Sequence, residues 1–352
     1  MSARPGGRVR GARLTDLAAL GELSRLSHQS DDRETGVRSL GLPVSRSQVS
    51  VFRLFRLPLG AFRPSDQLYV YEDDGRLAGL ARVERDPQRD EWTIVELDAV
   101  GIQEAGDIRL RLVQHLLRDG ARRGAIRFHV ACVDSGGNVE LFMQAGFIPY
   151  GQEHLLYQPP EVPLPRVPAE EAAEAGIRLA VPVDALALSR LYAQVTPAPV
   201  ARLEAYRLAD WERSGQQAAI PRSSLAPILR FAEVESFVQE GEGARGDELV
   251  GLLQVGVARE EQPHYLRVLA RSDRDATPLV RYGLSVIRER MSGGRSRVAR
   301  HDQGVIAPVR TYEAPVDRCF EECGFTNVAT VTLLMKEALV RVAEPALVPA
   351  TR

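Results

Sequence analysis

The strongest constraint on the fold is a phrase that closes both halves of the chain. The first half ends in LFMQAGFIPYGQEHLLYQ, which begins at Leu141, and the second ends in CFEECGFTNVATVTLLMKE, which begins at Cys319. Each copy passes from a short helical stretch through Gly-Phe into a long extended run. Glycine readily adopts the left-handed conformation that ends a helix, so each copy predicts a helix, a glycine cap and a closing strand. A chain that repeats this order is expected to repeat a domain.

A proline-rich segment separates the two halves. It runs from Gln158 to Gly176 and has five prolines among its first eleven residues. Proline lacks an amide donor and stiffens the chain toward polyproline geometry, which is typical of an interdomain linker. The predicted division is a first domain over residues 7–157, a linker over 158–176 and a second domain over 177–342. Each domain has an ordinary size.

Both halves show the same order of predicted elements. A short extended run, 9–14 or 177–181, precedes an amphipathic helix, and three extended runs then form an antiparallel meander. A further helix, 108–118 or 278–290, and a short extended segment lead to the closing phrase. The predicted fold class is α/β of the α+β type, with two tandem domains that each hold a mixed, mostly antiparallel sheet flanked by helices.

Composition excludes several other classes of protein. The chain has 352 residues, of which 44% belong to the AVILMFWYC set, so it is long and apolar enough for two cores. Its formal net charge of −2 provides no overall field for holding nucleic acid. The three cysteines match neither a disulfide framework nor a zinc signature, and no apolar run approaches the roughly 20 residues of a membrane helix. We expect a cytoplasmic protein without metal, nucleic acid or membrane partners.

The repeated order resembles the GCN5-related N-acetyltransferase (GNAT) superfamily over most of the chain outside the linker and tails. Its most specific element is AGF at Ala145–Phe147, which is echoed as CGF at Cys323–Phe325. The resemblance implies acetyl-CoA as cosubstrate and a primary amine, on a small molecule or a protein, as acyl acceptor. It also implies that the two domains pair within the chain.

In that family a loop of the form Q/R-x-x-G-x-G/A binds the CoA pyrophosphate through backbone amides at the start of a helix. The first half reads VGIQEAGDIRL, in which Gln103 and Gly106 match and Ile108 replaces the small third residue. By this resemblance the CoA-binding residues are Val100, Gly101, Gln103, Gly106, Asp107 and Ile108. A simple connection between strand and helix is the alternative. The second half has no glycine between Leu269 and Arg281, which predicts a degenerate domain.

The resemblance also indicates where an acid and a base are expected. The family often takes its base from the strand before the loop, where Glu96 is the candidate; a strand carboxylate without a catalytic role is the alternative. The acid is often a tyrosine four residues before the glycine of Gly-Phe, but Phe142 and Phe320 stand at these positions. Phenylalanine cannot donate a proton, so three alternatives stay open: solvent protonates the thiolate, another hydroxyl such as that of Tyr150 or Tyr157 does so, or the site is not catalytic.

Two functions therefore stay open. The first is an N-acyltransferase that moves acetyl from acetyl-CoA to an amine, which the partial loop match favours. The second is a non-catalytic acyl-CoA-binding or scaffolding protein that kept the fold, which Phe142 and Phe320 and the glycine-free second loop favour.

Overall fold

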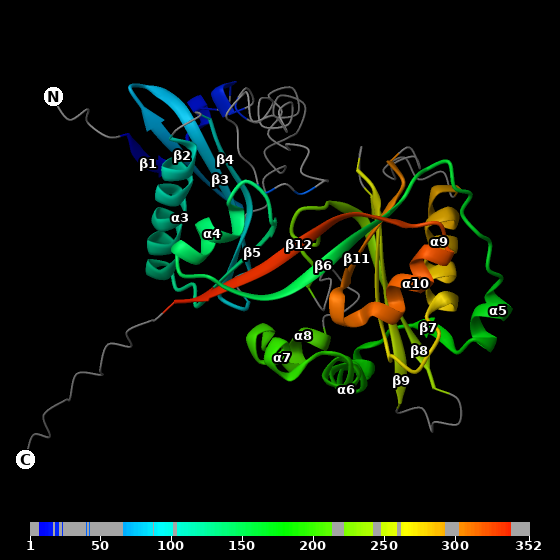
Figure 1. Cartoon of the computed structure of the whole chain (residues 1–352). Coiled ribbons are helices and arrows are strands. Elements are labelled where there is room, and N and C mark those ends of the chain that lie inside the picture. Colours follow the sequence, from blue (N-terminus) through cyan, green and yellow to red (C-terminus); the bar gives the residue numbers. More distant parts are fainter. Residues whose placement is uncertain are drawn as a thin grey trace, which may run out of the picture.

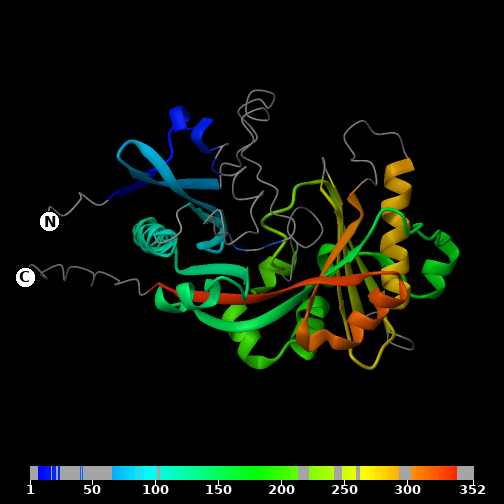
Figure 2. The same ribbon diagram turned by 45° about the horizontal axis from the view of Figure 1, so that its top comes forward.

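The protein consists of two α/β bodies joined by two long strands that run between them (Figures 1 and 2). The computed structural model describes residues 7–16, 18–20, 23, 40, 42, 66–86, 88–100, 104–212, 222–241, 248–258, 262–292 and 303–338. Within these ranges, no helix combines the length and the apolar character needed to cross a membrane.

One twelve-stranded sheet runs through both bodies, in the order β1-β2-β3-β4-β5-β12-β6-β11-β10-β9-β8-β7. The strands of the first half are β1 (Arg8–Gly11), β2 (Asp66–Asp73), β3 (Arg76–Asp86), β4 (Glu91–Ala99), β5 (Arg127–Val133) and β6 (Ile148–Gln158). Those of the second half are β7 (Ile177–Leu179), β8 (Phe231–Glu240), β9 (Leu249–Ala258), β10 (His264–Ala270), β11 (Val305–Arg310) and β12 (Thr326–Glu337). Strands β2–β3–β4 and β8–β9–β10 form the two predicted antiparallel meanders.

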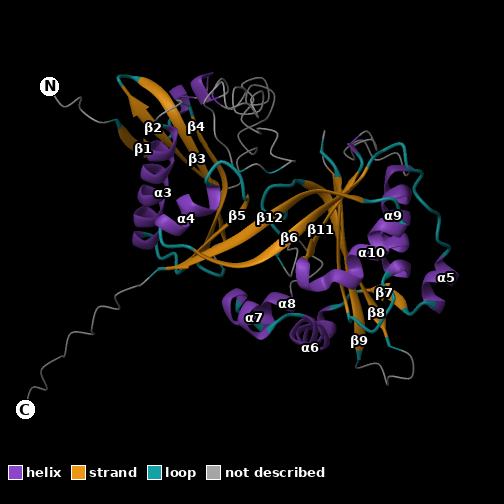
Figure 3. Ribbon diagram, viewed as in Figure 1, coloured by secondary structure: helices purple, strands orange, loops and turns teal. Residues whose placement is uncertain are grey.

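Helices cover both faces of the sheet (Figure 3). The described helices are α3 (Ala105–Arg122), α4 (Asn138–Gln144), α5 (Ala169–Glu174), α6 (Ala185–Val195), α7 (Ala198–Glu204), α8 (Leu208–Glu212), α9 (Thr277–Ser292) and α10 (Ala314–Glu322). In the second half α9 packs with Leu253, and α6 packs with its neighbour Leu252. Successive residues of a strand point to opposite faces, so these helices lie on opposite sides of the sheet.

The closing strands of the two halves are exchanged. Strand β12, from the second half, pairs with β5 of the first half, and β6, from the first half, pairs with β11 of the second. The two exchanged strands also pair with each other, antiparallel, at the centre of the sheet. The closing phrase predicted that each strand would complete a sheet but not which one, because an apolar pattern specifies the buried face of a strand and not its partner.

Each half opens with the same ion-pair cluster. An arginine on the first strand binds an aspartate six residues later and a glutamate on the neighbouring strand. The clusters are Arg10, Asp16 and Glu72 in the first half and Arg178, Asp184 and Glu240 in the second. In both, the arginine Nη2 lies 2.9 Å from the aspartate and Nε lies 2.6 Å from the glutamate. The same side-chain geometry, repeated, supports two copies of one unit.

The proline-rich segment packs against the second half. Residues 159–168 form neither helix nor strand, whereas α5 makes the later part of the predicted linker helical. Leu164 and Val167 are buried in the core of the second half, and the Val167 amide donates to Ser285 Oγ of α9 at 3.0 Å. The linker is therefore anchored on α9.

Candidate functional site

The sheet of the first half forks between β4 and β5. These strands pair in parallel only as far as Ile94 and Val130. Beyond that pair, β4 continues to Ala99 and β5 to Val133 without a ladder between them. At the same point a bulge removes Val95 from the pairing with β3, which bends β4 further from its neighbour. Beyond this pair the two strands form no ladder with each other, although the Val133 amide at the end of β5 donates to the Leu40 carbonyl at 2.9 Å.

Helix α3 starts six residues after β4 ends, and among the described residues the side chain of its N-cap residue, Glu104, forms no cap on the N-terminus. The Ile108 amide donates to the Glu104 carbonyl at 2.9 Å, which is the first hydrogen bond of the helix. The amides of residues 105–107 precede that bond and have no acceptor within the helix. These amides form a positive end at which an anion is stabilised.

The residues predicted to bind CoA are placed differently from one another. Gly106 and Asp107 lie in the uncapped first turn of α3, although Asp107 also pairs with Arg111 at 2.8 Å. The Val100 amide donates to the Ala78 carbonyl at 3.0 Å, so that amide is already bonded. Gly101 and Gln103 lie outside the described residues.

Ile108 is a core residue. Its side chain is 3% exposed and packs so closely on β3 that a Cβ at Gly79 would lie 2.6 Å from it. With its amide bonded to Glu104 as well, Ile108 offers a phosphate neither its side chain nor its N–H group.

The sheet of the second half also forks, but buried side chains of the protein lie beside this fork. Strands β10 and β11 pair only up to Tyr265 and Ile306. Two residues further along β10, Arg267 binds Glu313 through two hydrogen bonds of 2.7 Å, and both side chains are 1% exposed. An anionic ligand would have to displace Glu313 from this buried pair, which is costly.

The N-terminus of α9 is capped by the protein itself. Asp275 Oδ1 accepts a hydrogen bond from the Thr277 amide at 2.9 Å. This bond comes first among the interactions that hold the pKa of Asp275 below its usual value, so the carboxylate stays ionised at neutral pH. A fixed negative charge at this position opposes a pyrophosphate, in line with the predicted degeneracy of the second half.

The phenylalanines at the expected acid positions belong to the core. Phe142 and Phe320 are both 0% exposed. Each ring stacks edge-to-face on the phenylalanine of its own Gly-Phe phrase, Phe147 at 5.3 Å and Phe325 at 4.9 Å. Neither ring reaches a cleft, so these positions serve packing.

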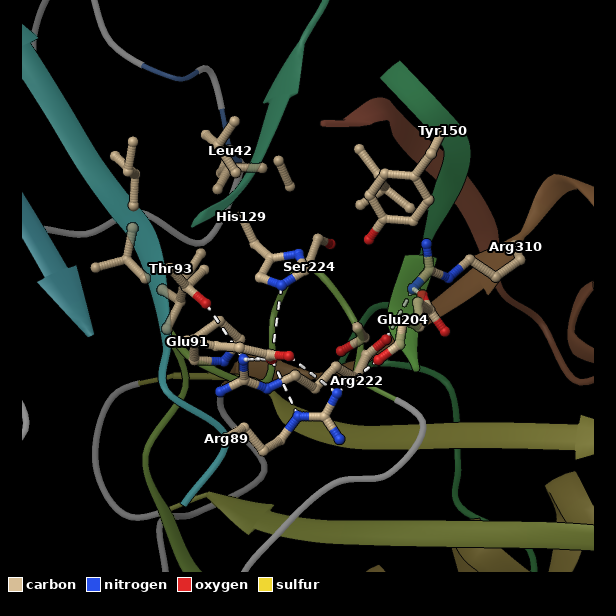
Figure 4. A pocket seen from close by; sticks show the side chains of 18 of the residues that line it. Leu42, Arg89, Glu91, Thr93, His129, Tyr150, Glu204, Arg222, Ser224 and Arg310 are labelled. Carbon is tan, nitrogen blue, oxygen red and sulfur yellow. Dashed lines mark hydrogen bonds and ion pairs between the residues drawn. The ribbon is translucent and has the colours of Figure 1, made fainter. Parts of the chain in front are cut away.

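A recess of about 580 Å³, counting the part open to solvent, lies between the two halves at the first fork (Figure 4). Four residues of the fork form part of its apolar wall: Ile94, Val95, Val130 and Ala131. The second half contributes Arg310 of β11 and side chains of the segment 222–228.

Glu91 lies at the polar floor of the recess, with its side chain 2% exposed. Arg89 binds both of its carboxylate oxygens at 3.0 Å, and Arg127 and Arg222 approach to 3.3 and 3.5 Å. Burial alone would raise the pKa of Glu91, but contacts with His129 and Arg89 outweigh it and hold that pKa well below its usual value. Glu91 is therefore an anion at any ordinary pH.

His129 stands beside Glu91, and its Nε2 lies 3.5 Å from Glu91 Oε2. Its ring projects into the recess opposite the ring of Tyr150 (Figure 4). The second candidate acid, Tyr157, instead donates its hydroxyl to the Gln303 carbonyl at 3.2 Å and does not line the recess.

Buried ion pairs across the recess hold the two halves together. Arg89, between β3 and β4, binds Asp210 of α8 and donates to the Glu204 carbonyl at 2.5 Å. Arg310 binds the Glu204 carboxylate at 2.7 Å and lies 3.4 Å from Glu153 of β6. These ion pairs of Arg89 and Arg310 hold the polar side of the recess in shape.

The predicted base, Glu96, lies on β4 outside the residues that line the recess. It is 3% exposed, and its Oε2 accepts a hydrogen bond from Arg82 Nε at 3.1 Å. Its Oε1 is buried and makes no hydrogen bond to any residue that the structure describes. Its catalytic role stays a prediction.

Sequence reasoning missed Glu91 and His129. Histidines are scattered through the chain, and a lone histidine on a strand more often packs than reacts. The signal lies in the register: Thr93 stands opposite His129 in the parallel ladder, and Glu91 precedes Thr93 by two residues on the same face. That register is not visible before the two strands are known to pair.

No group of three or more His, Cys, Asp and Glu side chains that could hold a metal ion occurs in the described part of the chain.

Comparison with protein-family models finds no match, and no curated protein matches the sequence. Two solved structures align over nearly the whole chain. A tandem GNAT protein from the clavulanic acid biosynthesis pathway is 13% identical, with a TM-score of 0.52 over 94% of this chain and 98% of that one. A GCN5-related N-acetyltransferase from Sphaerobacter thermophilus is 17% identical, with a TM-score of 0.54 over 96% of this chain and 97% of that one.

The sheet, the two forks and the duplicated opening cluster define a protein of two tandem α/β units with an open recess between them. The two aligned structures identify its architecture as the tandem GNAT fold.

Proposed function

We propose that this chain is an N-acyltransferase that transfers the acetyl group of acetyl-CoA to a primary amine bound in the recess. One observation carries the proposal: the recess reaches the fork of the first sheet, where the ladder between β4 and β5 ends. The similar solved structures, one of them a GCN5-related N-acetyltransferase, favour this reaction.

The proposal assigns opposite faces of the sheet to the two substrates. A Cβ at Gly120 of α3 would lie 2.9 Å from the Trp92 ring, so Trp92 faces α3. Glu91 and Thr93 neighbour Trp92 along β4 and therefore point away from α3, into the recess. An acyl-CoA held at α3 and an amine held in the recess would meet at the fork.

The residues of the first half fit acetyl-CoA. The amides of residues 105–107, which have no acceptor within the helix, would hold the pyrophosphate, with Gly106 allowing close approach of the backbone. The cosubstrate supplies the acyl group in activated form, as a thioester. The apolar fork residues Val95 and Val130 would exclude water from that group. The acceptor, a small molecule or a protein, is fixed by none of these features.

Acetyl-CoA binding is tested by thermal shift on the wild type, Gly106→Trp and the matched control Arg274→Trp. Arg274 is an exposed residue of the loop before α9. A ligand at a hundred times its Kd stabilises a protein by about 2.7 kcal/mol. We expect this stabilisation in the wild type and in Arg274→Trp but not in Gly106→Trp, because the indole would cover the amides. Equal losses in both variants would contradict the assignment to the first half.

Turnover separates catalysis from the second candidate, a non-catalytic acyl-CoA-binding protein. The internal cap on α9 and the buried Phe142 and Phe320 are the observations that favour the latter. A thiol reagent reports CoA release in the presence of simple amines. Stabilisation by acetyl-CoA without amine-dependent release would select the binding protein.

A further inference from the structure

We propose that His129, oriented by Glu91, is the catalytic base that takes the proton from the amine in the recess. The inference rests on the proposed function and assigns the acid–base step to a residue pair other than Glu96.

His129 occupies the position that the reaction needs. It is the last residue but one of β5 to pair with β4, so it stands next to the fork, and its ring lines the recess. Nε2 lies 3.5 Å from Glu91 Oε2, within ion-pair reach, but makes no hydrogen bond to any residue that the structure describes, and the other ring nitrogen lies on the side away from Glu91 (Figure 4). In catalytic triads a carboxylate likewise stands at one nitrogen of the histidine and the other nitrogen faces the substrate; here a small movement of the ring would close the hydrogen bond.

Glu91 is held rigidly for this task. Arg89 binds it through two parallel hydrogen bonds of 3.0 Å, which fixes the plane of the carboxylate. The anion favours the tautomer with hydrogen on Nε2, which leaves the lone pair of Nδ1 for the amine. It also stabilises the imidazolium that forms when His129 accepts a proton.

The pair belongs to the first half alone. Counted from the last paired residues of the two forks, His129 corresponds to Val305 and Glu91 to Gln262. Valine cannot accept a proton and glutamine carries no charge. The half whose helix N-terminus is uncapped is therefore also the half that has the imidazole–carboxylate pair.

The competing carboxylate is less well placed. Glu96 is ion-paired with Arg82 and does not line the recess, whereas His129 does. In the step we assign, the amine nitrogen bonds to the acyl carbon, the carbon–sulfur bond breaks and CoA leaves as a thiolate. The proton released from nitrogen passes to Nδ1 of His129 and then to water, and water protonates the thiolate, so charge and atoms balance.

The test uses the full chain, acetyl-CoA and two amine probes. Ethanolamine is a cation at neutral pH and must lose a proton before it attacks, whereas hydroxylamine is largely uncharged. Loss of a general base typically costs 10²–10⁴-fold in rate. We expect His129→Gln to lower the CoA release rate with ethanolamine about 100-fold at pH 7, and to lower the hydroxylamine rate less.

The pH profile and chemical rescue identify the role. In the wild type the ethanolamine rate should fall toward acid pH, and this acid limb should be absent in His129→Gln. The charged and titratable groups that line the recess together with His129 are Arg89, Glu91, Tyr150, Glu204, Tyr206, Arg222 and Arg310, and Arg127 contacts Glu91. Added imidazole should restore part of the rate of His129→Ala, because it can enter the vacated space.

The matched control is His154→Gln. His154 is also a strand histidine beside a carboxylate, 3.0 Å from Asp317, but it lies outside the recess. It should keep both rates and the acid limb. If the wild type turns over and His129→Gln keeps its rate and pH profile, the base assignment is overturned while the proposed function stands. If the wild type shows no amine-dependent CoA release, the base assignment and the proposed function are both overturned. Thermal stabilisation by acetyl-CoA would then show whether the protein still binds this ligand.

Discussion

Changing Phe142 to tyrosine, the residue expected at the acid position, should destabilise the protein without activating it. Phe142 is 0% exposed and stacks on Phe147 at 5.3 Å, so an added hydroxyl would enter a closed apolar core. Burying a hydroxyl without a hydrogen-bond partner costs about 1–3 kcal/mol in protein mutants. Phe142→Tyr should therefore lower the free energy of unfolding by about this amount, and the melting temperature by several degrees.

The matched variant is Phe320→Tyr, which makes the same change in the second half, where the ring is equally buried. Thermal and urea unfolding give the two costs, and the thiol-release assay gives the activity. We expect similar costs and no gain in rate from either variant. If Phe142→Tyr raised the rate severalfold and kept wild-type stability, its ring would have to reach the fork, and the description of Phe142 as a core residue would be wrong.

Two further predictions concern stability. Residues 1–158 and 159–352 should fail to fold as monomers when each is produced separately, because β12 covers the edge of β5. Produced together, the two fragments should form a 1:1 complex. Light scattering after size exclusion measures this, and two independently folded monomers would refute the prediction. The hydrogen bonds from Arg10 hold the pKa of Asp16 below its usual value, so this carboxylate adds stability above the unfolded-state pKa of about 3.9 and loses it as pH falls through the lower folded-state pKa. The melting temperature should consequently drop in acid below about pH 4, and less so in Asp16→Asn; an identical acid limb in both proteins would count against the ion pair.

Local signals in the sequence predicted the architecture well. The Gly-Phe phrases predicted left-handed caps, and Gly146 and Gly324 adopt φ of 87° and 85°. The meanders and the central helices of both halves follow from apolar periodicity and turn residues, which act over a few positions. That the second half is degenerate stays a prediction; the cap that Asp275 places on α9 is compatible with it.

The recess and the exchange of strands could not be predicted in this way, because both depend on pairing between distant residues. Arg310 and Arg89 lie more than 200 positions apart in the sequence and yet line the same recess. His129 acquires its partner only through the parallel register of β4 and β5. Such contacts are decided by the packing of the whole sheet, which a periodic pattern does not encode.

Because the closing strands are exchanged, a strand of the second half forms part of the site of the first half. Leu333 of β12 lines the recess, and Met335 of the same strand stands directly opposite His129 in the ladder with β5. A mutation in the last thirty residues of the chain can therefore alter the site of the first half, because β12 pairs directly with β5. Natural selection acting on that site would therefore also act on the second half, because a strand of the second half forms part of the wall of the site.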